Sequence, residues 1–326
     1  MTSAAPQIAP ASGPSSDPSP NPSLPGGRLL SGHLICMASM MAWAAGLPAA
    51  EFLIPIMPSD QLGAVRISLA ALVLLPVWLL SDGLRAVLRA DWLRGIMVGS
   101  LIGIAAWFLI MGQAAGGPVT AAVITAAMPV VAITLEVLFD GRRLSTRLLA
   151  GIALSMAGGV MALDFSGGGG NVALGALFCG GSVLLYTLGS RLTVTAFPQL
   201  SLVGRTALTM TGAAISMLLV ALANLALGAP LADPALWGLR EVISLCLFAI
   251  GGLALCQLLW IVAINRIGIG MSSLHTNASP FYVMIIMFLW LSAPWNWLQA
   301  GAAALVALGV LIAQGIIPLP RLKSRR

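Results

Sequence analysis

About ten apolar stretches, each of about 20 residues, fill almost the whole chain after residue 28. A helix of this length is long enough to cross the hydrocarbon core of a bilayer. Hydrophobic residues make up 59% of the chain and charged residues only 8%, and the mean hydropathy is +1.00. A soluble domain of this composition could not cover its surface with polar groups. We therefore expect an all-α polytopic membrane protein.

The predicted membrane helices number ten, which places both ends of the chain on the same side of the membrane. They cover residues 33–55, 62–80, 92–112, 118–138, 147–163, 172–190, 201–227, 241–264, 268–292 and 297–316.

Basic residues are distributed unevenly between the predicted loops. The loops on the side of the termini hold almost every loop Arg and Lys, whereas Arg240 is the basic residue of the opposite side. Because Lys and Arg collect in cytoplasmic loops, we expect both termini in the cytoplasm and a location in a bacterial-type inner membrane. The net charge of +6 then lies beside anionic lipid headgroups, so it does not indicate a nucleic-acid partner.

The Gly-rich stretch 167–170 separates five predicted spans from five more, and the two halves are similar. Residues 149–160 of the fifth span align with residues 299–310 of the tenth, Pro129 aligns with Pro280, and Arg66 aligns with Arg205. Since five is an odd number, the second copy must be inverted, as is common in secondary transporters. The expected regions are a disordered cytoplasmic tail (1–28), two five-helix repeats (29–165 and 166–316) and a basic cytoplasmic tail (317–326).

Several of these features together resemble the drug/metabolite transporter superfamily, EamA type. They are Trp43 in the first span, an Arg opening the second, the run Ala126-Ala-Met-Pro-Val-Val, the run Leu138-Phe-Asp-Gly-Arg-Arg-Leu-Ser145, and the small residues of the fifth and tenth spans. The resemblance covers residues 30–316. The acidic residue usual after the fourth and ninth spans is present as Asp140 but absent at Ala293-Pro294. The resemblance implies export of small metabolites, amino acids or drugs by alternating access.

Polar side chains concentrate in the ninth predicted span. Ser272, His275, Ser279 and Tyr282 share one helical face, and Asn277 lies on an adjoining one. Such groups are costly in a membrane unless they meet a partner or a water-filled cavity, so they indicate either a substrate site or interhelical hydrogen bonds. With aromatic and amide residues of other spans, the candidate substrate-binding residues are Trp43, Trp107, Tyr186, Gln257, Trp260, His275, Asn277 and Ser279.

Four charged residues near predicted helix ends are candidates for gating or coupling: Glu51, Arg66, Glu136 and Arg205. Glu51 is a possible partner of Arg66, and Glu136 could pair with Arg142 or Arg143 or carry a coupling proton. Alternatively, the side chains of Arg66 and Arg205 extend along the helix to the lipid headgroups. Small residues suggest close helix packing at Gly95, Gly99 and Gly103, and at Gly151, Ser155 and Gly159.

Other classes of function are less well supported. The sequence contains neither HExxH nor GxSxG, and its two histidines, His33 and His275, are too far apart in sequence to suggest a ligand pair, so an enzyme is not expected. Four cysteines without CxxC spacing indicate neither a disulfide framework nor a metal site, and no cofactor is expected. We expect a monomeric carrier whose cavity holds no central unpaired charge. Its substrate would be a neutral or zwitterionic metabolite, with amino acids as the leading class, and a multidrug efflux carrier or a channel as alternatives.

Overall fold

The computed structural model describes residues 26–139, 145–162, 169–313 and 316–317, and every regular element in these ranges is helical. The terminal tails, Asp140, the arginines proposed to pair with Glu136 and residues 167–168 of the Gly-rich stretch lie outside the described residues.

Six helical segments are long and apolar enough to cross a membrane. They are α1 (Gly26–Ala50), α2 (Ser59–Asp82), α4 (Trp92–Thr125), α7 (Gly169–Ala196), α8 (Leu202–Ala226), and a composite of α9 (Leu239–Cys246), a π-helical segment (Leu247–Leu255) and α10 (Cys256–His275). Shorter apolar helices are α5 (Met128–Phe139), α6 (Thr146–Met161), α11 (Ser279–Leu291) and α12 (Trp297–Ala313); α3 (Leu84–Leu88) is a short connection. The molecule is thus an all-α multi-pass membrane protein.

The helix starts follow local capping chemistry. The Asp91 side chain accepts a hydrogen bond from the Arg94 backbone N–H at the start of α4, at 3.1 Å. The hydroxyls of Ser145 and Ser201 do the same for α6 and α8. Each cap satisfies an N–H that has no partner within its own helix.

The break expected between the third and fourth spans lies where it was predicted, in the gap 113–117. Within α4, Gly117 has the non-helical angles φ 78° and ψ 166°, so residues 92–125 are two helical segments joined at a kink. Glycine adopts this positive φ without a steric penalty, and Pro118 follows it at the start of the second segment. The predicted span 118–138 has a further break, which was not predicted, at residues 126–127 before α5.

The break expected near residue 266 is displaced. The helix continues to His275, and a 3-10 turn over Thr276–Ala278 separates it from α11. Pro280 lies in the first turn of α11 and Pro129 in that of α5, positions at which the missing proline N–H costs nothing. Both prolines therefore begin a helix after a break rather than bend a continuous one.

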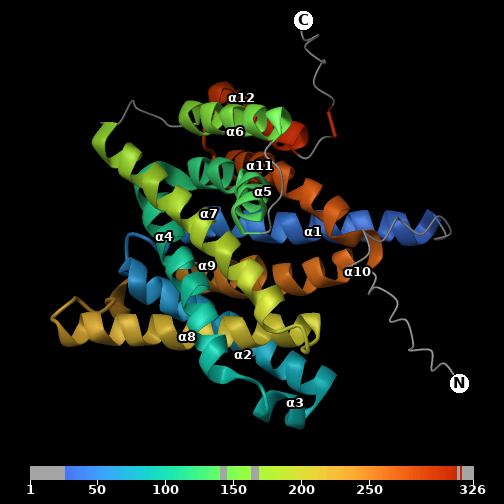
Figure 1. Ribbon diagram of the computed structural model, residues 1–326. Coiled ribbons are helices and arrows are strands. Elements are labelled where there is room, and N and C mark those ends of the chain that lie inside the picture. The colour runs from blue at the N-terminus through green and yellow to red at the C-terminus, as the bar shows by residue number, and fades with distance from the viewer. Residues whose placement is uncertain (1–25, 140–144, 163–168, 314–315, 318–326) are drawn as a thin grey trace, which may run out of the picture.

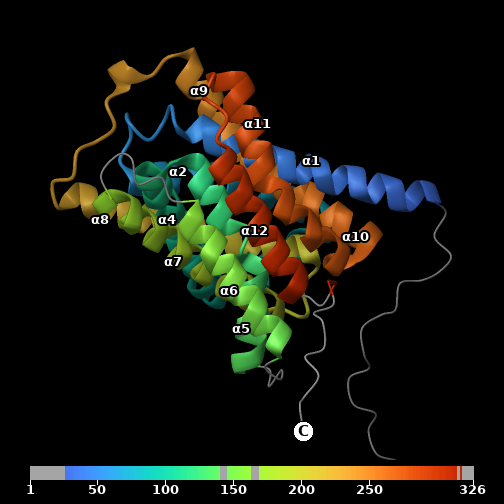
Figure 2. The ribbon, with the colours of Figure 1, turned by 90° about the horizontal axis from the view of Figure 1, so that it is seen from above.

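Close helix pairs organise the bundle. Figures 1 and 2 show α6 and α12 side by side, and α1 running along α10. The α4–α8 pair is packed backbone to backbone, since a Cβ added to Gly99 would lie 2.5 Å from the Ala213 backbone nitrogen. In the α6–α12 pair, Gly151 approaches Gly309 in the same way. The prediction for Gly159 was wrong: an added Cβ there meets no described atom within 4 Å, and Gly158 faces α12 instead.

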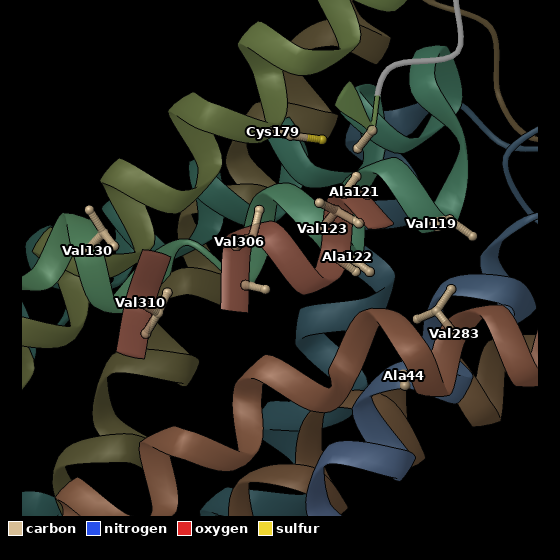
Figure 3. Close-up of a cluster of buried hydrophobic side chains, with 14 of the residues drawn as sticks. Ala44, Val119, Ala121, Ala122, Val123, Val130, Cys179, Val283, Val306 and Val310 are labelled. Carbon is tan, nitrogen blue, oxygen red and sulfur yellow. The ribbon is translucent and has the colours of Figure 1, made fainter. Parts of the chain in front are cut away.

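The largest cluster of buried apolar side chains joins helices from both halves of the chain. Figure 3 shows members of this cluster from several helices, among them Val123, Val283, Val306 and Val310, together with Ala44 of α1. Because β-branched and small residues dominate this cluster, the helices can pack closely here.

Candidate functional site

A cavity of about 1010 Å³ lies among α1, α2, α4, α5, α7 and α10. Most of its lining is apolar, and hydroxyl groups such as those of Ser182, Thr187 and Ser279 are interspersed. The charged side chains of the lining are Arg66 and Arg191; within the described ranges it contains neither Asp nor Glu. The expectation of a cavity without central charge was therefore wrong, because α2 directs an arginine inward.

Arg66 is the most deeply buried of these groups, with 3% of its surface exposed. Its Nε donates a hydrogen bond to the Phe248 carbonyl at 3.3 Å, and its guanidinium carbon lies 3.8 Å from the centre of the Phe248 ring. Both contacts join α2 to the π-helical segment. The predicted partner, Glu51, accepts a hydrogen bond from Gln113 at 2.9 Å instead. Among the described residues Arg66 has no ion pair.

Five of the candidate substrate-binding residues lie in the cavity wall. Gln257 donates from Nε2 to the Tyr186 hydroxyl at 3.0 Å, which joins α10 to α7. Trp43 of α1 and Trp260 of α10 add aromatic surface, and Ser279 lies at the start of α11. The wall thus offers a cation, an amide, hydroxyls and aromatic rings, the mixture with which proteins orient small polar ligands in a mainly apolar site.

The other three candidates lie elsewhere. Trp107 donates from its ring N–H to the Ser59 hydroxyl at 2.9 Å. Asn277 is buried, and its Oδ1 has no hydrogen-bond partner within the described part of the chain. His275 and His33 are partners, with His33 Nδ1 3.0 Å from His275 Nε2. Their separation in the sequence was misleading, because α1 packs along α10.

The candidate gating residues differ in their locations and in their hydrogen-bond partners. Glu51 is held by Gln113, whose Nε2 also donates to the Leu47 carbonyl at 2.6 Å. Arg205 is outside the cavity lining, and its Nε is buried without a partner among the residues that the structure covers. Glu136 lies in α5, but its side chain is outside the described set. The sequence did not reveal Gln113 or His33, because each matters only through a helix distant in sequence.

Comparison with known proteins identifies the class. The family model described as the EamA-like transporter family matches residues 30–163. A relative described as the uncharacterized transporter YyaM of Bacillus subtilis (strain 168) is 26% identical over 289 residues, covering 82% of this chain and 88% of its own length. Residues 30–163 thus match the EamA-like transporter family, and the chain is similar along most of its length to a protein described as a transporter.

A solved structure has a similar fold. A crystal structure, described only as that of a protein, matches with a TM-score of 0.63 and 20% sequence identity, covering 88% of this chain and 97% of its own. At this identity the match concerns the fold alone. In this chain, that fold is the multi-pass helical arrangement that surrounds the cavity.

Proposed function

We propose that this transporter exports small metabolites, with amino acids as the leading class, across a bacterial-type inner membrane. The cavity carries the proposal, because polar and aromatic side chains from distant parts of the chain line one space of about 1010 Å³. Trp43 comes from α1, whereas Gln257 and Trp260 come from α10. The volume is within the range of small-molecule sites in proteins.

Alternating access is the proposed mechanism. The similarity between the fifth and tenth predicted spans supports two inverted repeats, which could rock around a site at their interface. The helix breaks before Pro129 and Pro280 are related features of the two proposed repeats. The protein would act as a monomer without a cofactor, and protons are candidate coupling ions.

Counterflow in proteoliposomes tests this function. Vesicles loaded with unlabelled leucine should accumulate external radiolabelled leucine transiently, because a carrier exchanges solute through one site. Vesicles without the protein are the control, and an imposed pH gradient tests for proton coupling. Uptake without any stimulation by internal leucine would indicate a channel, and selective exchange of a sugar phosphate would exclude the amino-acid proposal.

Accessible tags test the proposed orientation. Tags at residues 5 and 326 should both be reached only from the cytoplasm, and a tag near Asp233 only from outside, since loop Arg and Lys lie on the side of the termini. Termini on opposite sides of the membrane would exclude an even number of spans and the inverted repeat.

Multidrug efflux is the second candidate. It is favoured by the mainly apolar lining and by a volume larger than one amino acid needs. Extrusion of hydrophobic dyes by cells that overproduce the protein, combined with the absence of leucine counterflow, would favour this candidate over metabolite export.

A further inference from the structure

We infer that Arg66 is the anchor for a substrate carboxylate, so that the cavity accepts solutes with a carboxylate and rejects their uncharged or purely cationic analogues. The inference rests on the proposed function and specifies the substrate class of the same site.

The first step is the charge of the cavity. Its described lining contains the cations Arg66 and Arg191 but no carboxylate. Arg191 has other interactions, including its guanidinium 5.2 Å from the centre of the Phe139 ring. Arg66, with 3% of its surface exposed, has only neutral partners among the described residues. A buried charge is costly until it meets a counter-ion.

The second step is the geometry of the guanidinium. Nε is used by the Phe248 carbonyl, and one face of the group lies over the Phe248 ring at 3.8 Å. These contacts fix the plane of the group and leave Nη1 and Nη2 without a hydrogen bond to any described residue. A planar fork of N–H donors held in a fixed orientation is suited to bidentate binding of a carboxylate.

The third step is the surroundings of the fork. The wall of the same cavity includes Ile67, Ile102 and Leu253, which would accept an apolar side chain. Trp43 and Trp260 offer ring faces to an ammonium group through cation–π contact. A zwitterionic amino acid would thus place its carboxylate on Arg66, and a simple monocarboxylate would keep that contact while it loses the ammonium contact.

Intrinsic tryptophan fluorescence tests this inference independently of transport, because Trp43 and Trp260 line the cavity. The purified protein is titrated with leucine, with 4-methylpentanoate, which lacks the ammonium group, and with leucinamide, which lacks the carboxylate. Leucine and 4-methylpentanoate should bind about 10- to 100-fold more tightly than leucinamide, the range expected for a charge-assisted contact. Equal affinities for leucine and leucinamide, or tighter binding of inorganic phosphate than of 4-methylpentanoate, would overturn it.

Substitution of the anchor gives the second test. Arg66→Gln should weaken binding of both carboxylates by about 10- to 100-fold and leave leucinamide unchanged, and Arg66→Lys should have an intermediate effect. Arg240→Gln is the matched control. Arg240 also lies over an aromatic ring, 4.8 Å from the centre of Phe52, but it is outside the cavity lining and its side chain is 69% exposed. If Arg66→Gln does not fold, the titrations of the unchanged protein still decide the question.

The outcomes separate the anchor from the transport function. Carboxylate-dependent binding without counterflow would retain the anchor and exclude the proposed transport of leucine. Counterflow that is equal for leucine and leucinamide, and unchanged in Arg66→Gln, would retain transport and exclude the anchor.

Discussion

The α4–α8 interface and the central cavity are built from opposite kinds of residue. In the interface, Gly99 and Gly212 bring two backbones into contact, and an added Cβ on either would overlap the partner helix. In the cavity, the large side chains of Trp43, Arg66 and Trp260 stand around empty space. The comparison indicates that the interface determines how the helices are placed, whereas in the proposed function the cavity would determine which solute is accepted. Substitutions in the two regions should therefore change different measurements.

Gly99→Val should have the largest effect on stability. Its Cβ would lie 2.5 Å from the Ala213 backbone nitrogen and 2.7 Å from the Gly212 carbonyl carbon, so α4 and α8 must separate. We expect the free energy of unfolding to fall by about 1–3 kcal/mol. Thermal unfolding in detergent measures this. Gly159→Val is the matched control, since no described atom lies within 4 Å, and it should change stability by less than about 0.5 kcal/mol. Equal melting temperatures would contradict the contrast.

Gln257→Ala should affect transport more than stability. It removes the hydrogen bond to Tyr186 from the cavity wall, at a cost of about 0.6 kcal/mol in stability, but we expect transport to fall about tenfold or more. Counterflow normalised to folded protein measures the difference. Gln113→Ala is the control, because Gln113 is a buried amide outside the cavity lining that bonds to Leu47 and Glu51. Its loss of transport should follow its loss of stability. The opposite pattern for the two variants would contradict the division of roles.

The His33–His275 pair should contribute to the contact between α1 and α10 rather than to the cavity wall. A double-mutant cycle of His33→Ala and His275→Ala should give a coupling energy of about 0.6–1.7 kcal/mol, as for other hydrogen bonds between membrane helices. Thermal unfolding of the three variants measures it. If the coupling is zero and leucine protects a cysteine placed at position 275 from a water-soluble thiol reagent, His275 lines the transport path instead.

Trp107→Phe should have the smallest effect. The substitution removes the hydrogen bond to Ser59 and retains most of the aromatic surface, so stability should fall by no more than about 0.6 kcal/mol and leucine counterflow should be unchanged. A severalfold loss of transport at unchanged stability would place Trp107 in the substrate path and enlarge the site beyond the observed cavity.

The fold class could be predicted because the length and spacing of apolar stretches depend on the bilayer and little on tertiary detail. The break at Gly117 lies between two predicted spans, whereas the breaks at residues 126–127 and 276–278 were not predicted, because Pro129 and Pro280 begin helices rather than interrupt them. Periodicity shows that a proline disturbs a helix but does not show on which side the break occurs.

The candidate site was predictable only in part. Gln257 and Trp260 could be assigned to an interior face, since both lie on one short stretch of helix. The role of Arg66 depends on its contact with Phe248, 182 residues away, and that of His275 on His33, 242 residues away. Such contacts are set by helix packing, which the pattern of a single span does not encode.

The π-helical segment Leu247–Leu255 changes the rotational phase of the composite helix to which it belongs. A π-helix has more residues in each turn than an α-helix. The face that α10 presents to the cavity is therefore rotated relative to the face it would present if an uninterrupted α-helix continued from α9. Gln257 is the second residue after this segment, and its direction into the cavity therefore depends on how far the helix has been turned before it. One residue more or fewer between 247 and 255 would point a different row of side chains at the solute, so single-residue insertions and deletions here are a route to new specificity that leaves every cavity residue unmutated.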